Sequence, residues 1–193
     1  MQTKTIFTVP ILRPILRFLS VWGLRLSGWK LVGGPPPELN KMVIIAAPHT
    51  SNWDFPLMLA CVFKMRLAGN WMGKDSLFPP VFGPVMRWLG GISIDRSKAN
   101  NMVDQMVEQF SMRDKLCLIM TPEGTRGQVR EWKSGFYRIA LAAGVPIVFA
   151  ADDSVSKTVK CDRVFWPTGD YEKDIIEIRS YFAGCVGIKA DRT

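Results

Sequence analysis

The feature that most constrains this chain is a regular alternation, from residue 41 onward, of short apolar runs with segments of helical spacing. The expected strands are 42–47, 70–73, 91–95, 115–120, 145–151 and 158–165, and the expected helices are 55–67, 80–89, 98–112, 134–143 and 171–182. Strands that alternate with helices form a mostly parallel sheet covered by helices on both faces. The sequence therefore predicts an α/β fold, in which ligands bind beyond the carboxyl ends of the strands.

Size and composition support one domain with a substantial core. The chain has 193 residues, of which 48% are hydrophobic and 22% charged, and this balance excludes a disordered chain. Four cysteines are scattered without a C-x-x-C pair, and His49 is the sole histidine. We therefore expect a reducing compartment, no disulfide framework and no zinc site.

Positive charge is concentrated near the N-terminus. Lys and Arg number 25 against 17 Asp and Glu, which gives a net charge of +8, and residues 1–41 alone carry +5. This distribution indicates an anionic partner that meets the N-terminal segment. Nucleic acid and anionic lipid both fit the charge alone.

Residues 6–29 have the pattern of an interfacial helix. At 100° per residue, Arg13, Arg17, Ser20 and Ser27 fall within about 80° of one another, and most of the remaining circumference is apolar. The uncharged runs are too short to span a bilayer. The alternative is a helix packed on its own domain. We expect a membrane-associating segment over 1–34, a stiff Gly-Pro linker at its end, and a catalytic domain over 35–193.

Three polar clusters directly follow expected strands, at 48–54, 95–96 and 121–127, and should gather at one edge of the sheet. In the first, Asp54 can reach one imidazole nitrogen of His49 and leave the other free as a base. No G-x-S-x-G nucleophile motif is present, so the pair suits activation of a substrate hydroxyl. The alternative is a structural histidine that caps a loop.

The third cluster has the groups that bind phosphate. Gly124, Thr125 and Arg126 offer backbone N–H groups, a hydroxyl and a guanidinium, and Arg96 could add a second guanidinium. Glu123 is expected to orient an arginine, and donors near the Gly124 turn are candidates to stabilise an oxyanion. The alternative is a surface salt bridge.

Four blocks in this order resemble a known family. They are H-x-x-x-x-D at 49–54, a Gly-to-Arg block that ends at Arg96, P-E-G-T-R at 122–126, and V-P-I at 145–147. Together they resemble the glycerolipid acyltransferases, which include the 1-acylglycerol-3-phosphate acyltransferases, over about residues 43–150. Residue 127 is Gly where the family often has Ser, which leaves the acceptor open.

The resemblance implies roles for individual residues. His49 would be the general base and Asp54 its orienting partner, while Glu123, Gly124, Thr125, Arg126 and Arg96 would bind the acceptor phosphate. Lys74 stands where a basic residue often opens the second block. The acyl donor would be a thioester of coenzyme A or acyl carrier protein, and neither a metal nor a bound cofactor is expected.

The expected function is therefore an O-acyltransferase that acylates a lysophospholipid, foremost 1-acylglycerol-3-phosphate, at the cytoplasmic face of an anionic membrane. Another acceptor, such as a lyso-aminolipid or glycerol-3-phosphate, is a second interpretation. A non-catalytic membrane-binding module is a third. Nucleic-acid binding is disfavoured because the basic residues lie on an apolar helix.

Overall fold

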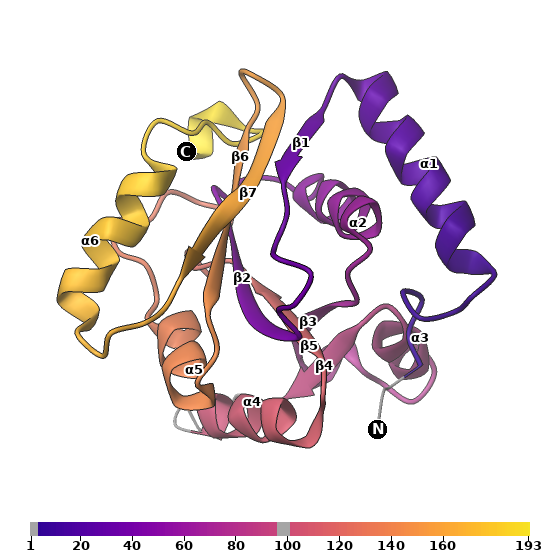
Figure 1. Cartoon of the computed structure of the whole chain (residues 1–193), viewed down its shortest axis with the longest axis horizontal. Helices are drawn as coiled ribbons and strands as arrows, with labels where there is room; N and C mark the ends of the chain where they lie inside the picture. Colours follow the sequence, from indigo (N-terminus) through magenta and orange to yellow (C-terminus); the bar gives the residue numbers. More distant parts are fainter. Residues whose placement is uncertain (1–3, 96–100) are drawn as a thin grey trace.

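A seven-stranded sheet forms the centre of the computed structural model, which describes residues 4–95 and 101–193 (Figure 1). The strands are β1 Lys30–Gly33, β2 Lys41–Ala47, β3 Gly69–Lys74, β4 Gly91–Ile94, β5 Leu116–Met120, β6 Ile147–Asp153 and β7 Thr158–Phe165. Their order is β1-β7-β6-β2-β5-β3-β4, and β6–β7 is the antiparallel pair among otherwise parallel pairs. The predicted α/β class with a mostly parallel sheet is confirmed.

Helices cover both faces of this sheet. They are α1 Leu12–Ser27, α2 Asp54–Met65, α3 Gly83–Trp88, α4 Asn101–Met112, α5 Gly135–Ala143 and α6 Tyr171–Phe182, with 3₁₀ turns η1 Asp75–Leu77 and η2 Ala190–Arg192. The helix expected at 80–89 begins later, at Gly83, where Pro84 occupies its first turn. The start expected for the helix at 98–112 lies outside the described residues.

The core consists of two layers that the alternation along the central strand separates. On β2, Val43 and Ile45 pack with the helices α4, α5 and α6, while Met42 and Ile44 pack on the opposite face against α2. All four side chains are buried. Because both faces of β2 are covered, its sequence is a continuous apolar run rather than an alternating one.

The N-terminal segment is attached to this sheet in two ways. Leu24 of α1 is buried against α2, and Arg13 donates a hydrogen bond to the Arg66 carbonyl at 3.1 Å. After α1, residues 30–33 form β1, which pairs in parallel with β7. The sequence analysis missed this strand, because four residues next to a Gly-Pro run carry too little periodicity. The expected boundary at residue 34 thus follows a strand of the sheet.

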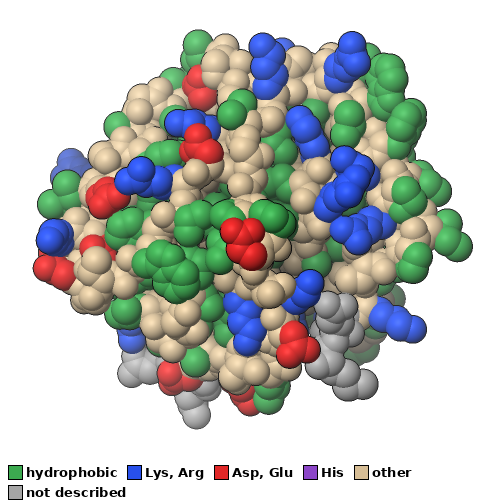
Figure 2. All heavy atoms as spheres, viewed as in Figure 1, with side chains coloured by type: hydrophobic (Ala, Val, Ile, Leu, Met, Phe, Trp, Pro, Cys, Tyr) green, Lys and Arg blue, Asp and Glu red, His purple; other side chains and the backbone are tan. Residues whose placement is uncertain are grey.

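The outward face of α1 is apolar. Large exposed side chains recur at helical spacing on α1 and the residue before it: Ile11, Ile15, Phe18, Leu19, Trp22 and Leu26. Figure 2 shows hydrophobic side chains along this edge of the molecule, with Lys and Arg side chains next to them. In the described part of the chain, no helix combines the length and hydropathy needed to cross a bilayer.

Candidate active site

The carboxyl ends of three neighbouring parallel strands meet at the site. In the order β6-β2-β5, the chain leaves β2 into His49, leaves β5 into the segment 121–127, and ends β6 at Asp152 and Asp153. The first and third polar clusters therefore do gather at one edge of the sheet. The second follows β4 at the end of the sheet, beyond β3 and β5, and its Arg96 lies outside the described residues.

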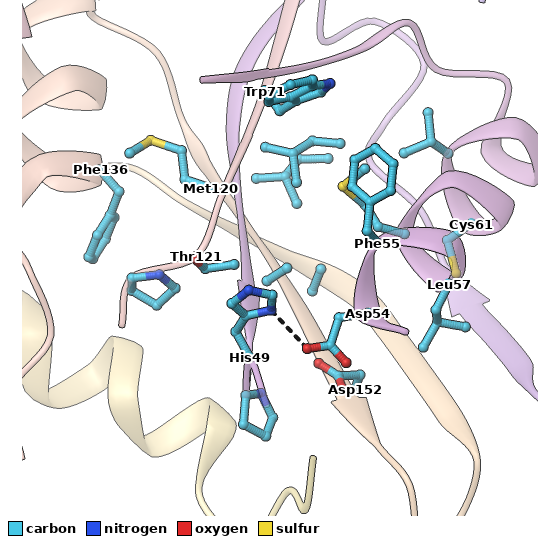
Figure 3. Close-up of a pocket in the computed structure, with 18 of the residues that line it drawn as sticks. His49, Asp54, Phe55, Leu57, Cys61, Trp71, Met120, Thr121, Phe136 and Asp152 are labelled. Carbon is cyan, nitrogen blue, oxygen red and sulfur yellow. Dashed lines mark hydrogen bonds and ion pairs between the residues drawn. The ribbon is translucent and has the colours of Figure 1, made fainter. Parts of the chain in front are cut away.

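His49 and Asp54 form a direct pair. The Nδ1 atom of His49 lies 2.8 Å from Oδ2 of Asp54, and the two side chains are 22% and 14% exposed (Figure 3). The same Oδ2 accepts the backbone N–H groups of Thr50 and Ser51 at 2.8 and 2.9 Å. Asp54 is the first residue of α2, so its carboxylate lies at the helix N-terminus and closes the preceding loop around the imidazole. In the described residues Nε2 has no hydrogen-bond partner.

Glu123 supports His49 from the neighbouring strand. Its Oε2 accepts the backbone N–H of His49 at 2.8 Å, and the residue is 9% exposed. Burial raises the pKa of Glu123 above its ordinary value, and the bond from His49 opposes that shift. The sequence analysis expected Glu123 to orient an arginine. Instead its carboxylate turns toward the adjacent end of β2, and no ion pair joins it to an arginine of the described ranges.

The phosphate-type donors line a polar depression next to His49. This cavity of about 410 Å³ is formed by His49, Thr121 and residues 124–127, together with Arg192 of η2. Gly124 has a φ of +67°, which glycine adopts without strain, and its N–H donates to the Thr121 carbonyl at 3.2 Å. That N–H is thus occupied within the turn, and the other donors near the Gly124 turn stay the candidates to stabilise an oxyanion. Lys74 is exposed and lines neither this cavity nor the apolar cavity on the α2 side of the sheet.

A larger, mainly apolar cavity of about 550 Å³ lies behind the His49–Asp54 pair. Its wall includes Ala46 of β2 and Ala150 of β6, which are register partners, and their small side chains leave space between the sheet and α2. Larger apolar groups complete the wall, among them Ile44, Leu57, Met58, Val62, Trp71, Ile119 and Phe136. The volume falls within the range of about 300–1,000 Å³ that is typical of ligand pockets.

Two cysteine thiols also lie in this wall. Burial raises the pKa of the Cys61 and Cys161 thiols to about 12, so neither is a ready nucleophile. No cluster of three or more metal-binding side chains occurs in the part of the chain that the structure describes.

Sequence analysis missed three residues at the site: Asp152, Lys133 and Arg192. A signal existed for Asp152, since alternation along β6 places it on the same face as Val148. Lys133 and Arg192 carried none, because their positions depend on how distant loops fold over the site.

Comparison with known proteins identifies the family. The family model described as Acyltransferase matches residues 35–151, which run from the segment before β2 through most of β6. The chain belongs to this acyltransferase family. The predicted resemblance to glycerolipid acyltransferases is confirmed, since curated relatives of this acyltransferase are named 1-acyl-sn-glycerol-3-phosphate acyltransferases. That of Haemophilus influenzae is 31% identical over 73% of this chain and 60% of its own length.

Other relatives agree. The Escherichia coli protein of the same name is 31% identical over 63% of this chain and 51% of its own, and the Pseudomonas aeruginosa protein is 26% identical over 89% and 68%. The acyltransferase chain thus spans about half to two thirds of these relatives. The crystal structure of the 1-acyl-sn-glycerophosphate acyltransferase from Thermotoga maritima shares the fold, with a TM-score of 0.61, 22% identity, and coverage of 89% of this chain and 75% of that one.

Proposed function

We propose that this acyltransferase moves a fatty acyl group from a thioester of coenzyme A or acyl carrier protein to the hydroxyl of a lysophospholipid, foremost 1-acylglycerol-3-phosphate. The observation that carries the proposal is the His49–Asp54 pair at 2.8 Å, which lines both the apolar cavity and, through His49, the polar depression. The names of the relatives point to the same acceptor.

In this mechanism His49 is the general base. Asp54 holds Nδ1, so Nε2 accepts the proton of the acceptor hydroxyl as its oxygen attacks the thioester carbonyl. The carboxylate stabilises the imidazolium that forms. When the tetrahedral intermediate collapses, the C–S bond breaks and the imidazolium returns the proton to the leaving thiolate. General-base assistance of this kind contributes about 10²–10⁴-fold.

The two cavities divide the substrates. The apolar cavity suits an acyl chain, because its wall is mainly aliphatic and aromatic and it extends from His49 along α2. The polar depression suits the acceptor phosphate. Arg126 is its principal ligand, and Gly124, Thr125 and Arg192 also line it. Arg96 and Lys74 remain proposed phosphate ligands by family resemblance alone. The Glu123 carboxylate positions His49 by accepting the backbone N–H of His49.

An acceptor panel tests the substrate. Purified protein with labelled palmitoyl-CoA or palmitoyl-acyl carrier protein is offered 1-acylglycerol-3-phosphate, glycerol-3-phosphate, monoacylglycerol and a lyso-aminolipid. We expect the first acceptor to give the highest kcat/KM and His49→Ala to remove its acylation. Preference for a phosphate-free acceptor would favour the lyso-aminolipid class, and no turnover with any pair would favour the non-catalytic module.

We also propose that α1 holds the enzyme on an anionic membrane at the cytoplasmic face. Insertion of the six exposed side chains would contribute about 9 kcal/mol at the low end of the per-residue range, before immobilisation costs. Arg25, whose guanidinium lies 5.7 Å from the Trp22 ring centroid, places positive charge beside this stripe. The four cysteines are free thiols, three of them buried, and free thiols are typical of a reducing compartment such as the cytoplasm.

The interpretation of α1 changes in one respect. The arc of α1 that contains Arg13, Leu16 and Ser20 faces the body of the enzyme. Leu16 packs against the core residues between the sheet and α2. The helix therefore both packs on its own domain and leaves an apolar stripe outward. The two sequence interpretations are compatible, because they describe opposite faces of α1.

A further inference from the structure

Asp152 is a buried acid in the wall of the apolar cavity. It is 8% exposed and is the sixth residue of β6, where alternation points its side chain to the α2 face, as for Val148 and Ala150. It lines the same cavity as His49 and Asp54, and Figure 3 shows its carboxyl group next to that of Asp54. The mechanism above assigns it no role.

Each of the two carboxyl groups has a buried oxygen without a hydrogen-bond partner. These atoms are Oδ1 of Asp54 and Oδ2 of Asp152, and neither finds a donor among the described residues. Oδ2 of Asp54 is already used by three donors, from His49, Thr50 and Ser51. Buried polar atoms are rarely left unpaired, and a single proton between the two carboxyl groups would satisfy both.

The electrostatic setting favours retention of that proton. Burial, followed by the charge of Asp54, raises the pKa of Asp152 to about 8. Two carboxylates that share an apolar site cannot both ionise readily. The titratable groups that surround Asp152 or share its cavity are His49, Asp54, Glu123, Lys133, Asp153, Cys61, Cys161 and Cys185. The three thiols have raised pKa values, so they add no charge near neutrality.

We propose that Asp152 is a positioning residue for the His49–Asp54 pair, a neutral carboxylic acid that donates a hydrogen bond to Oδ1 of Asp54 and whose ionisation inactivates the site. The proton keeps the Asp54–Asp152 pair at one negative charge and fixes the second oxygen of Asp54. When it is lost at alkaline pH, a second negative charge opposes the oxyanion and thiolate that form during transfer. This consequence for turnover rests on the proposed acyl transfer, whereas the shared proton does not.

Two substitutions separate the hydrogen bond from the charge. Asp152→Asn keeps a donor of the same shape but cannot ionise, while Asp152→Leu has similar size and no donor. We expect Asn to retain turnover at pH 7 within about threefold of the wild type and to lose the fall in kcat near pH 8. We expect Leu to lower kcat about tenfold or more at unchanged acceptor KM. Asp104→Asn, an exposed acid on α4, is the matched control.

A second measurement does not require activity. Because His49 is the sole histidine, its imidazole gives one set of NMR signals in the untagged protein. In the wild type we expect these signals to report an additional titration near pH 8, which is absent in Asp152→Asn and present in Asp104→Asn. This result would stand even if the acyl acceptor proposed above were wrong.

The proposal is overturned if Asp152→Asn retains both the alkaline fall in kcat and the additional titration of the imidazole. It is also overturned if a folded Asp152→Leu variant turns over like the wild type, which would leave Asp152 with a packing role. A change confined to the acceptor KM would make it a substrate contact instead of a positioning residue.

Discussion

Arg126 is exposed in the polar depression beside His49, where its guanidinium can bind a phosphate. Arg126→Ala should raise the acceptor KM by about tenfold or more, because charge-assisted hydrogen bonds contribute about 1.5–3 kcal/mol each. The donor KM and the fold should change little. Steady-state kinetics with varied acceptor and donor measure both constants, and Arg130→Ala in the same loop but outside either cavity is the control. A rise confined to the donor KM would place the thioester carrier at Arg126.

Asp152 should also make stability depend on pH. Its native pKa of about 8 lies above the unfolded value, so between about pH 4 and pH 8 the native state holds a proton that the unfolded state has lost. The free energy of unfolding should fall as pH rises through this window, at a slope of up to about 1.4 kcal/mol per pH unit from this group. Urea unfolding from pH 5 to 8 measures the slope, which should be smaller in Asp152→Asn. Equal slopes would show that Asp152 is ionised in the native state.

Glu123 should matter for stability as well as for turnover. Glu123→Ala leaves the part-buried N–H of His49 without its acceptor and should cost about 1–3 kcal/mol of unfolding free energy. Glu123→Gln keeps an amide oxygen at that position and should recover most of it. Chemical denaturation of the two variants checks the difference. If both variants unfold at the wild-type midpoint, the backbone of His49 does not depend on this bond.

At this scale the sequence predicted pairs within one turn better than pairs between strands. The five-residue spacing of His49 and Asp54 across a strand-to-helix turn was sufficient to expect their contact. The partner of Glu123 was not predictable, because its distance from His49 depends on which strands are neighbours in the sheet. The turn uses the N–H of Gly124 itself, so an oxyanion donor near this turn stays a prediction that falls on its other groups.

Among the elements, α1 gives the most direct test of membrane binding. Replacing Phe18, Leu19 and Trp22 by Ser should strongly reduce cosedimentation with anionic vesicles while changing unfolding free energy little, because all three are exposed. High salt alone should release little wild-type protein, since salt screens charge and leaves the apolar contribution intact. The control replaces Val155, Trp166 and Ile176, which are 59–78% exposed and lie outside α1. A wild-type protein that ignores the vesicles would contradict the proposal.

The helices and strands were predictable where the hydrophobic pattern extends over many residues. The strand at 158–165 and the helix at 171–182 coincide with β7 and α6. The short β1 was missed, since its place beside β7 is a tertiary pairing. Helical spacing also separated two faces of α1 correctly, but it carries no information on which face meets the protein.

In the whole molecule, the site is assembled from segments far apart in sequence. Beyond the three strand ends, the C-terminal segment crosses the same region, where the Lys189 N–H donates to Oγ1 of Thr50 at 3.0 Å and Ser154 donates to the Val186 carbonyl at 2.7 Å. The sequence analysis placed no functional group beyond residue 150, because nothing local links Arg192 to His49. Strand order and this crossing are global properties that residue patterns do not encode by themselves.

The central claim is that His49 is the base of an acyl transfer, and its removal is the most direct test. His49→Ala should lower kcat for acylation of 1-acylglycerol-3-phosphate by about 10²–10⁴-fold. The circular dichroism spectrum and vesicle binding should match the wild type, and Asp54→Asn should keep a measurable part of the activity. Near-normal turnover by a folded His49→Ala enzyme would contradict the account, because the described site offers no other base in the position of Nε2.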